Sequence, residues 1–197
     1  MQLRPHQNKA LEAMARHSKG QIIVPTGGGK TLVAIKDAMR RLDGVTNPTI
    51  VVVAPRILLA EQLSSEFLEV IREKYKDINV LHVHSGETKH YSTTKADEIE
   101  EWVSNTQDSK IIFTTYHSLH RLVEADVVID TIYFDEAHNS VQRNFIEFVE
   151  HYTLPFNALR SYFFTATPKH SLTPMKVGMN ESDIFGNVIC NVPAPRL

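Results

Sequence analysis

The chain has 197 residues, of which 42% are hydrophobic and 22% charged, and its formal net charge is −2. A chain of this size suits one domain that can bury a core without disulfides or metal ions. The single cysteine, Cys190, excludes an internal disulfide and a cysteine-based zinc cluster. The small net charge excludes an overall basic field, so any contact with nucleic acid has to come from a local patch.

The sequence has no segment typical of a secretory signal or a membrane span. The residues from Met1 to Pro5 open no apolar stretch typical of a secretory signal, and no apolar run approaches the ~20 residues that span a bilayer. A single cysteine fits a reducing compartment. We therefore expect a cytoplasmic or nucleoid-associated protein (nuclear in a eukaryote) that is not secreted and has no membrane partner.

Short apolar runs alternate along the chain with stretches of helical spacing. The runs predict buried strands at 21–24, 49–54, 79–83, 110–114, 132–134 and 162–165. Between the strands, apolar residues recur three or four positions apart, as in an amphipathic helix: Leu32, Ile35, Met39 and Leu42; Leu59, Leu63, Phe67 and Val70; Val141, Phe145 and Val149.

The order of these elements predicts the fold class. Strands alternate with helices, and their β-branched runs lack a polar face, so the expected fold is α/β with a mostly parallel sheet and helices on both faces. Thr94 and Asp97 have the spacing of a capping box and predict a helix through Trp102. From Lys169 the chain is richer in Pro, Gly and Asn, and we expect an exit segment there, not another strand–helix unit.

A glycine-rich loop provides the strongest local signal. It runs from Val24 to Thr31 as VPTGGGKT, between a predicted strand and a predicted helix. Glycines let backbone N–H groups approach phosphate oxygens, and the helix directs its positive end at the same anion. Lys30 would then reach the β- and γ-phosphates, and the Thr31 hydroxyl would coordinate Mg²⁺. Val24 stands where the strict phosphate-loop pattern has its first glycine.

A phosphate loop needs a carboxylate that holds the metal, usually at the end of another strand. Asp135 and Glu136 follow the predicted strand at 132–134. Asp135 would hold Mg²⁺ and Glu136 would act as the general base on the attacking water. An acidic pair after a strand is often only a solvated loop, and it is the combination with Lys30 that favours the catalytic interpretation.

With these motifs in place, the chain resembles the DEAH-type and restriction-subunit-like (ResIII) branch of superfamily 2 helicases. Motif I is similar to Thr26–Thr31, and motif II matches Asp135 to His138 letter for letter. Other segments are similar to the upstream adenine-recognition element (3–7), motif Ia (54–56), motif Ib (114–116) and motif III (165–167). The resemblance spans residues 3 to 167, with the motifs in the family order.

The resemblance implies a RecA-like P-loop NTPase domain at 1–168 that uses ATP and Mg²⁺. It places Arg4, Gln7, Thr26, Gly27, Gly28, Gly29, Lys30 and Thr31 around the nucleotide, with Gln7 reading the base edge. The family continues into a second RecA-like domain that supplies an arginine to the ATP site. We expect 169–197 to lead toward that partner domain, and the chain to be a fragment that binds ATP weakly and hydrolyses it poorly. An arginine of this kind is worth ~10³–10⁵ in rate in related systems.

The resemblance also implies a nucleic-acid track, with DNA favoured over RNA. Arg56 would pair with a phosphate and Thr115 would donate a hydroxyl hydrogen bond. Ser85 and Gly86 are weaker phosphate-contact candidates, for which a plain turn is the better explanation.

Coupling residues between the nucleotide and the track are the last group that the resemblance implies. Thr165 and Thr167 would couple the state of the nucleotide to the grip on the strand, and His138 would contact motif III or the nucleotide. The acidic run 97–101 should repel nucleic acid, so the track is expected elsewhere.

The chain contains 10 histidines, which raises the question of a metal site. His82 and His84 are two apart on a predicted strand and so share a face. Without a cysteine or a nearby acidic third ligand, the sequence does not favour zinc there.

Other functions remain open. The same motor could translocate along duplex DNA without unwinding it, as in restriction or remodelling enzymes. A small-molecule kinase would need a lid with arginines, and a non-catalytic nucleotide-binding module would not need Lys30, Thr31, Asp135 and Glu136 together.

Overall fold

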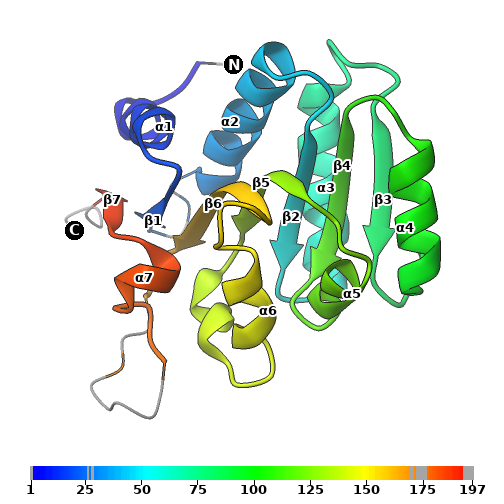
Figure 1. Cartoon of the computed structure of the whole chain (residues 1–197). Helices are drawn as coiled ribbons and strands as arrows, with labels where there is room; N and C mark the ends of the chain where they lie inside the picture. Colours follow the sequence, from blue (N-terminus) through cyan, green and yellow to red (C-terminus); the bar gives the residue numbers. More distant parts are fainter. Residues whose placement is uncertain (1, 26, 28, 169–170, 172–176, 193–197) are drawn as a thin grey trace.

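Seven parallel strands form one sheet in the computed structural model, which describes residues 2–25, 27, 29–168, 171 and 177–192. The spatial order is β3-β4-β2-β5-β6-β1-β7 (Figure 1). The strands are β1 (Lys19–Ile23), β2 (Thr49–Ala54), β3 (Asn79–Val83), β4 (Lys110–Thr115), β5 (Ile129–Phe134), β6 (Ala158–Thr165) and β7 (Val188–Asn191).

Helices connect the strands and cover the sheet. They are α1 (Pro5–Arg16), α2 (Lys30–Gly44), α3 (Ile57–Ile71), α4 (Ala96–Asn105), α5 (Leu119–Glu124), the 3₁₀ helix η1 (Ala137–Val141), α6 (Ile146–His151) and α7 (Ser182–Phe185). Within the described residues, no helix combines the length and the apolar character that a membrane crossing requires.

Each face of the sheet has its own hydrophobic core. Along β2, Ile50 and Val52 face the core that α1, α2 and α3 close, whereas Val51 and Val53 face the core that α4, α5 and α6 close. The alternation follows from the strand geometry, in which successive side chains point to opposite faces. Both faces are covered, as the runs without a polar side predict, and the expected α/β class with a parallel sheet is confirmed (Figure 1).

The predicted strands agree with the structure in place and differ at some ends. Those at 49–54 and 79–83 match β2 and β3 in full, while β5 and β6 begin three and four residues earlier than their apolar cores. The early residues of β5 include Asp130, whose carboxylate accepts two hydrogen bonds from Arg41 of α2 at 2.9 and 2.6 Å. A charged residue satisfied by a distant partner does not show in a local hydrophobic pattern.

Three expectations about local structure are wrong. Helix α4 begins after Lys95 without a side-chain cap, and the hydroxyl that accepts the Lys95 N–H belongs to Thr93, not Thr94. The helical spacing of Val141, Phe145 and Val149 spans η1 and α6, which are separate. The segment after Lys169 contains α7 and the edge strand β7, which pairs with β1, so it adds a strand to the sheet. That this segment leads to a further domain remains a prediction.

A buried ion pair fixes α2 to the sheet. Asp37, 1% exposed, accepts hydrogen bonds from both terminal nitrogens of Arg160 on β6 at 2.7 and 2.9 Å, and the Tyr133 hydroxyl also donates to it. Burial by itself would lower the pKa of the Arg160 guanidinium, but the hydrogen bonds and charge of Asp37 raise it above its ordinary value. Because α2 begins at Lys30, this pair holds the helix that carries the predicted phosphate-binding lysine.

Candidate functional site

The predicted site residues lie at one edge of the sheet. All strands are parallel, so their carboxyl ends share an edge, which is where open α/β sheets bind ligands. The glycine-rich loop follows β1, the acidic pair follows β5, and β6 with Thr165 at its end lies between these two strands. The tertiary order thus brings together motifs that are about 100 residues apart in sequence.

The described part of the glycine-rich loop adopts backbone angles that favour glycine. Gly27 and Gly29 have φ values of 80° and 76°, in the left-handed region, and Gly29 is the N-cap of α2. A Cβ at position 29 would lie 2.1 Å from Gln7 Nε2 and 2.8 Å from Arg4 Nη2, so a larger residue would displace these side chains in addition to straining the backbone. Thr26 and Gly28, also predicted to bind nucleotide, lie outside the described residues.

The predicted adenine-recognition element packs against this loop. Gln7 Nε2 donates to the Gly29 carbonyl at 3.1 Å, its Oε1 accepts the Arg4 N–H at 2.7 Å, and Arg4 Nη2 donates to the Gly27 carbonyl at 3.4 Å. Gln7 is 3% exposed. Its amide therefore supports the loop, and because it has a second N–H and a second lone pair, its reading of a base edge remains a prediction.

Lys30 meets both predicted acids. Its ammonium lies 3.4 Å from Asp135 Oδ1 and forms a short ion pair with Glu136 Oε1. Burial raises the pKa of the Asp135 carboxyl, an effect that the neighbouring Lys30 charge opposes and Glu136 reinforces. Glu136 has φ of 46°, in the left-handed region, so the backbone turns sharply directly after Asp135.

The arrangement fits a bound triphosphate with its metal. Thr31 and Asp135 line the same small cavity beside Lys30, so a hydroxyl and a carboxylate oxygen, ligands that Mg²⁺ prefers, lie together. At Gly27 no atom of the described residues lies within 4 Å of the position that a Cβ would take, so the loop backbone is open there to the close approach that phosphate binding needs.

A chain of hydrogen bonds joins the loop to motif II through β6. The Val24 N–H donates to the Thr165 carbonyl at 3.1 Å, and Thr165 Oγ1 lies 3.0 Å from His138 Nδ1. The same hydroxyl accepts the Thr167 N–H at 3.2 Å. The predicted contact between His138 and motif III is confirmed, while its coupling role remains a prediction.

The predicted nucleic-acid residues surround a hollow at the same edge. Arg56, Ser85 and Thr115 line a cavity of about 290 Å³, and the turn continues into Gly86, where φ is 123°. A second cavity of about 510 Å³ shares Arg56 with the first and extends to Glu136 and His138. Arg56 is exposed, and the acidic side chains of α4 lie on another element, away from both cavity linings.

Two contacts that support the acidic pair were not predicted from the sequence. The buried Tyr116 hydroxyl donates to the Asp135 carbonyl at 2.8 Å, and Asn139 Nδ2 donates to the Glu136 carbonyl at 2.8 Å. Both hold the backbone of the acidic pair. Tyr116 lies in the segment 114–116 that resembles motif Ib, directly after β4. Its position at this strand end is the signal that could have indicated the contact.

This parallel sheet, with a glycine-rich loop and an acidic pair at its carboxyl edge, has the RecA-like fold of solved helicase and restriction-enzyme domains. The chain belongs to the family of the res subunit of Type III restriction enzymes, whose sequence profile matches residues 1–170. No curated protein sequence matches the chain.

Solved structures with the same fold come from restriction enzymes and helicases. A nuclease-deletion mutant of the Type ISP restriction-modification enzyme LlaGI, solved with a DNA substrate mimic, has a TM-score of 0.77 at 23% identity over 98% of this chain and 20% of its own. The UvsW helicase from Bacteriophage T4 has a TM-score of 0.63 at 15% sequence identity, and the match covers 95% of this chain and 60% of UvsW. The Hef helicase domain from Pyrococcus furiosus has a TM-score of 0.59 at 20% sequence identity, and the match covers 93% of this chain and 37% of the Hef chain. The chain thus spans only part of each.

Proposed function

We propose that this chain is the ATP-binding motor domain of an ATP-dependent DNA helicase, in which ATP hydrolysis drives movement along a DNA strand or its unwinding. The observation that carries the proposal is the meeting of Lys30 with Asp135 and Glu136 at the carboxyl edge of the sheet. Membership of the res-subunit family supports an enzyme of this kind.

Each residue has a definite task in this mechanism. The N–H groups of the glycine-rich loop and the Lys30 ammonium bind the β- and γ-phosphates, and Thr31 and Asp135 hold the metal. Magnesium, when bound, neutralises charge on the phosphates. Glu136 orients the attacking water and accepts its proton. In the structure the Lys30 ammonium is ion-paired with the Glu136 carboxylate. Phosphate binding would draw the ammonium away and so free this carboxylate to act on water.

The DNA strand would follow the hollow beside Arg56. Arg56 supplies the charge, and Ser85 and Thr115 supply hydroxyls that bind phosphate oxygens without reading the bases. The cavity that shares Arg56 also reaches Glu136 and His138, which provides a short route between the strand and the nucleotide. Solved neighbours with bound DNA favour DNA over RNA.

A second candidate keeps the motor and changes its output. Membership of a restriction-enzyme family favours a translocase that moves on duplex DNA without separating the strands. In either case we propose that 169–197 leads to a second RecA-like domain, whose arginine completes the ATP site, and that the isolated chain therefore hydrolyses ATP poorly. A non-catalytic nucleotide-binding module is disfavoured because Lys30, Thr31, Asp135 and Glu136 are all present.

The nucleotide site is tested by three variants of the full-length protein, assayed for binding of a fluorescent ATP analogue and for ATPase with single-stranded DNA, duplex DNA and RNA. Lys30→Ala should abolish nucleotide binding. Glu136→Gln should preserve binding and slow turnover by about 10²–10⁴-fold. Lys36→Ala, on the same helix but outside the site, is the matched control and should match the wild type.

Two outcomes would contradict the assignment. Unchanged nucleotide binding by Lys30→Ala would rule out the phosphate site, and normal turnover by Glu136→Gln would rule out the base. A strand-displacement assay beside a triplex-displacement assay then separates the two candidates, because only a helicase releases the strand and a duplex translocase removes only the third strand.

A further inference from the structure

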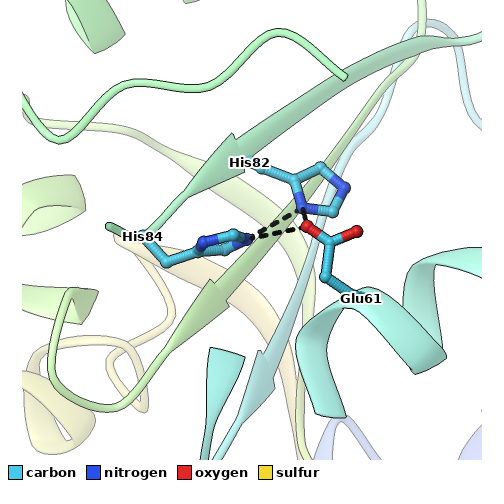
Figure 2. A group of neighbouring side chains, drawn as sticks. All are labelled: Glu61, His82 and His84. Carbon is cyan, nitrogen blue, oxygen red and sulfur yellow. Dashed lines mark hydrogen bonds and ion pairs between the residues drawn. The ribbon is translucent and has the colours of Figure 1, made fainter. Parts of the chain in front are cut away.

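Three side chains direct potential ligand atoms at one another: one from α3, one from β3 and one from the residue that directly follows β3 (Figure 2). His82 Nδ1 lies 3.0 Å from His84 Nε2, and Glu61 Oε1 lies 3.5 Å from each of these nitrogens. The expectation that the two histidines have no acidic residue nearby is therefore wrong. Glu61 is about 20 residues away in sequence and reaches them because α3 packs on the same face of the sheet.

The hydrogen bonds around the cluster are compatible with lone pairs on the ring nitrogens at its centre. His84 Nδ1 lies 3.3 Å from the Ser85 carbonyl, which can only accept, so the proton of a neutral His84 is on Nδ1 and Nε2 carries a lone pair. His82 Nε2 is engaged with the Ser64 hydroxyl at 3.0 Å. Nδ1 of His82 and Nε2 of His84 therefore face each other with Glu61 Oε1 beside them (Figure 2).

A proton alone does not satisfy this arrangement. A proton on His82 Nδ1 could join the two rings, but Glu61 Oε1 would remain buried without a hydrogen-bond partner, as it is in the structure. Leaving a buried carboxylate oxygen unpaired is costly. A divalent cation at the centre would satisfy all three atoms together.

The size of the cluster selects the kind of cation. Separations of 3.0, 3.5 and 3.5 Å place a central point about 1.9 Å from all three atoms. Tetrahedral zinc, with bonds of about 2.0–2.1 Å, separates its ligand atoms by about 3.3 Å and lies slightly above their plane. Calcium needs longer bonds, of about 2.3–2.6 Å, and magnesium prefers oxygen ligands. Imidazole nitrogens suit zinc and its first-row neighbours.

We propose that Glu61, His82 and His84 form a binding site for a divalent transition-metal ion, and that zinc is the ion that fits best. The rings are already oriented for it, because Ser64 and the Ser85 carbonyl engage the ring nitrogens that face away from the centre, as outer-shell partners of metal-bound histidines do. His82 and His84 are 0% and 2% exposed, so their positions are held by packing. Three protein ligands leave a tetrahedral ion one further position.

The site joins two elements at the predicted DNA track. Glu61 lies in the first turns of α3, whose N-cap is Arg56, and His84 is followed by Ser85 and Gly86. An ion bound here would tie the start of α3 to the end of β3 and so fix Arg56 relative to Ser85. The metal site itself does not depend on the proposed motor function.

Zinc titration of the purified protein tests the proposal. The protein is produced without a polyhistidine tag, stripped with a chelator, and titrated by calorimetry in excess Mg²⁺, which occupies oxygen-rich sites. We expect one zinc per chain, and a Tm increase of roughly 5–10 °C when free zinc exceeds its Kd about 100-fold. Co²⁺ in place of zinc should show the intense visible absorption of tetrahedral coordination.

Two variants on the same helix provide the comparison. Glu61→Gln removes the carboxylate charge with little change in shape and should weaken zinc binding at least about 10-fold. Glu66→Gln, also partly exposed on α3, should bind like the wild type. His84→Asn is the second ligand variant, with the same expected loss. The proposal is overturned if the wild type shows no saturable zinc binding, if its Co²⁺ spectrum is that of the six-coordinate aquo ion, or if Glu61→Gln binds zinc as tightly as the wild type.

Discussion

The buried carboxylate of Asp37 offers the sharpest test of how the site is held. Asp37→Asn keeps the shape of the side chain and removes its charge, while Arg160 stays in place with a side chain only 11% exposed. The variant therefore leaves a guanidinium in the interior without its counter-ion. It also weakens the hydrogen bond that the Tyr133 hydroxyl donates.

The expected loss follows from the contacts. Asp37 accepts two hydrogen bonds from Arg160, at 2.7 and 2.9 Å, and is 1% exposed, so solvent hardly screens the pair. Removing one partner of such a buried pair costs about 3–5 kcal/mol. In a domain of this length, 1 kcal/mol shifts Tm by roughly 2–4 °C, which predicts a decrease of about 6–20 °C.

Thermal unfolding followed by circular dichroism, with urea unfolding at 25 °C, measures this loss. Asp43→Asn is the matched control, because the Asp43 side chain is 44% exposed and its ion pair with Lys74 is screened by solvent, so its Tm should not change measurably. If Asp37→Asn unfolds within 2 °C of the wild type, about the smallest shift that 1 kcal/mol produces, then the pair does not anchor α2 and the reasoning fails.

Two other predictions concern Asp130 and Thr165. Burial alone raises the pKa of the Asp130 carboxyl, but the hydrogen bonds and charge of Arg41 lower it below its usual value. The stability that this ion pair contributes is therefore complete above the unfolded-state pKa of about 3.9, and it is lost as the pH falls through the lower pKa of the folded state. Asp130→Asn should flatten that acid-side loss in urea unfolding between about pH 2 and pH 6, and an unchanged slope would contradict it. Thr165→Val removes the hydroxyl shared by His138 and Thr167 and should lower the free energy of unfolding by about 1–3 kcal/mol, whereas Thr165→Ser should restore most of it; equal stability of the two variants would refute the importance of this hydroxyl.

Much of the candidate nucleotide site could be predicted because its signals are local. The glycine-rich loop and the acidic pair each follow a short apolar run, and the residue types determine what the backbone and side chains can bind. The structure brings Lys30 to Asp135 and Glu136, and His138 to Thr165, as these motifs require. It also gathers Arg56, Ser85 and Thr115 around one hollow.

Other features depended on long-range pairing and were missed. Strand β7 is only four residues long and forms by adding to β1. Glu61 reads in sequence as one more charge on a helix, and becomes a third ligand only because α3 lies against β3. The contacts of the Gln7 amide with the loop and with Arg4 were not foreseen either, while its reading of a base remains a prediction.

The sequence by itself determined the α/β class, the succession of strands and helices, and the chemistry available at the carboxyl ends of the strands. These properties follow from side-chain periodicity and from residue types within a few positions of one another, so they can be predicted without knowledge of the fold. Only the tertiary structure decided which strand ends are neighbours, because strand order is set by packing across the whole sheet. For that reason it alone placed β6 between the loop and the acids, buried Asp37 against Arg160, and assembled Glu61 with His82 and His84.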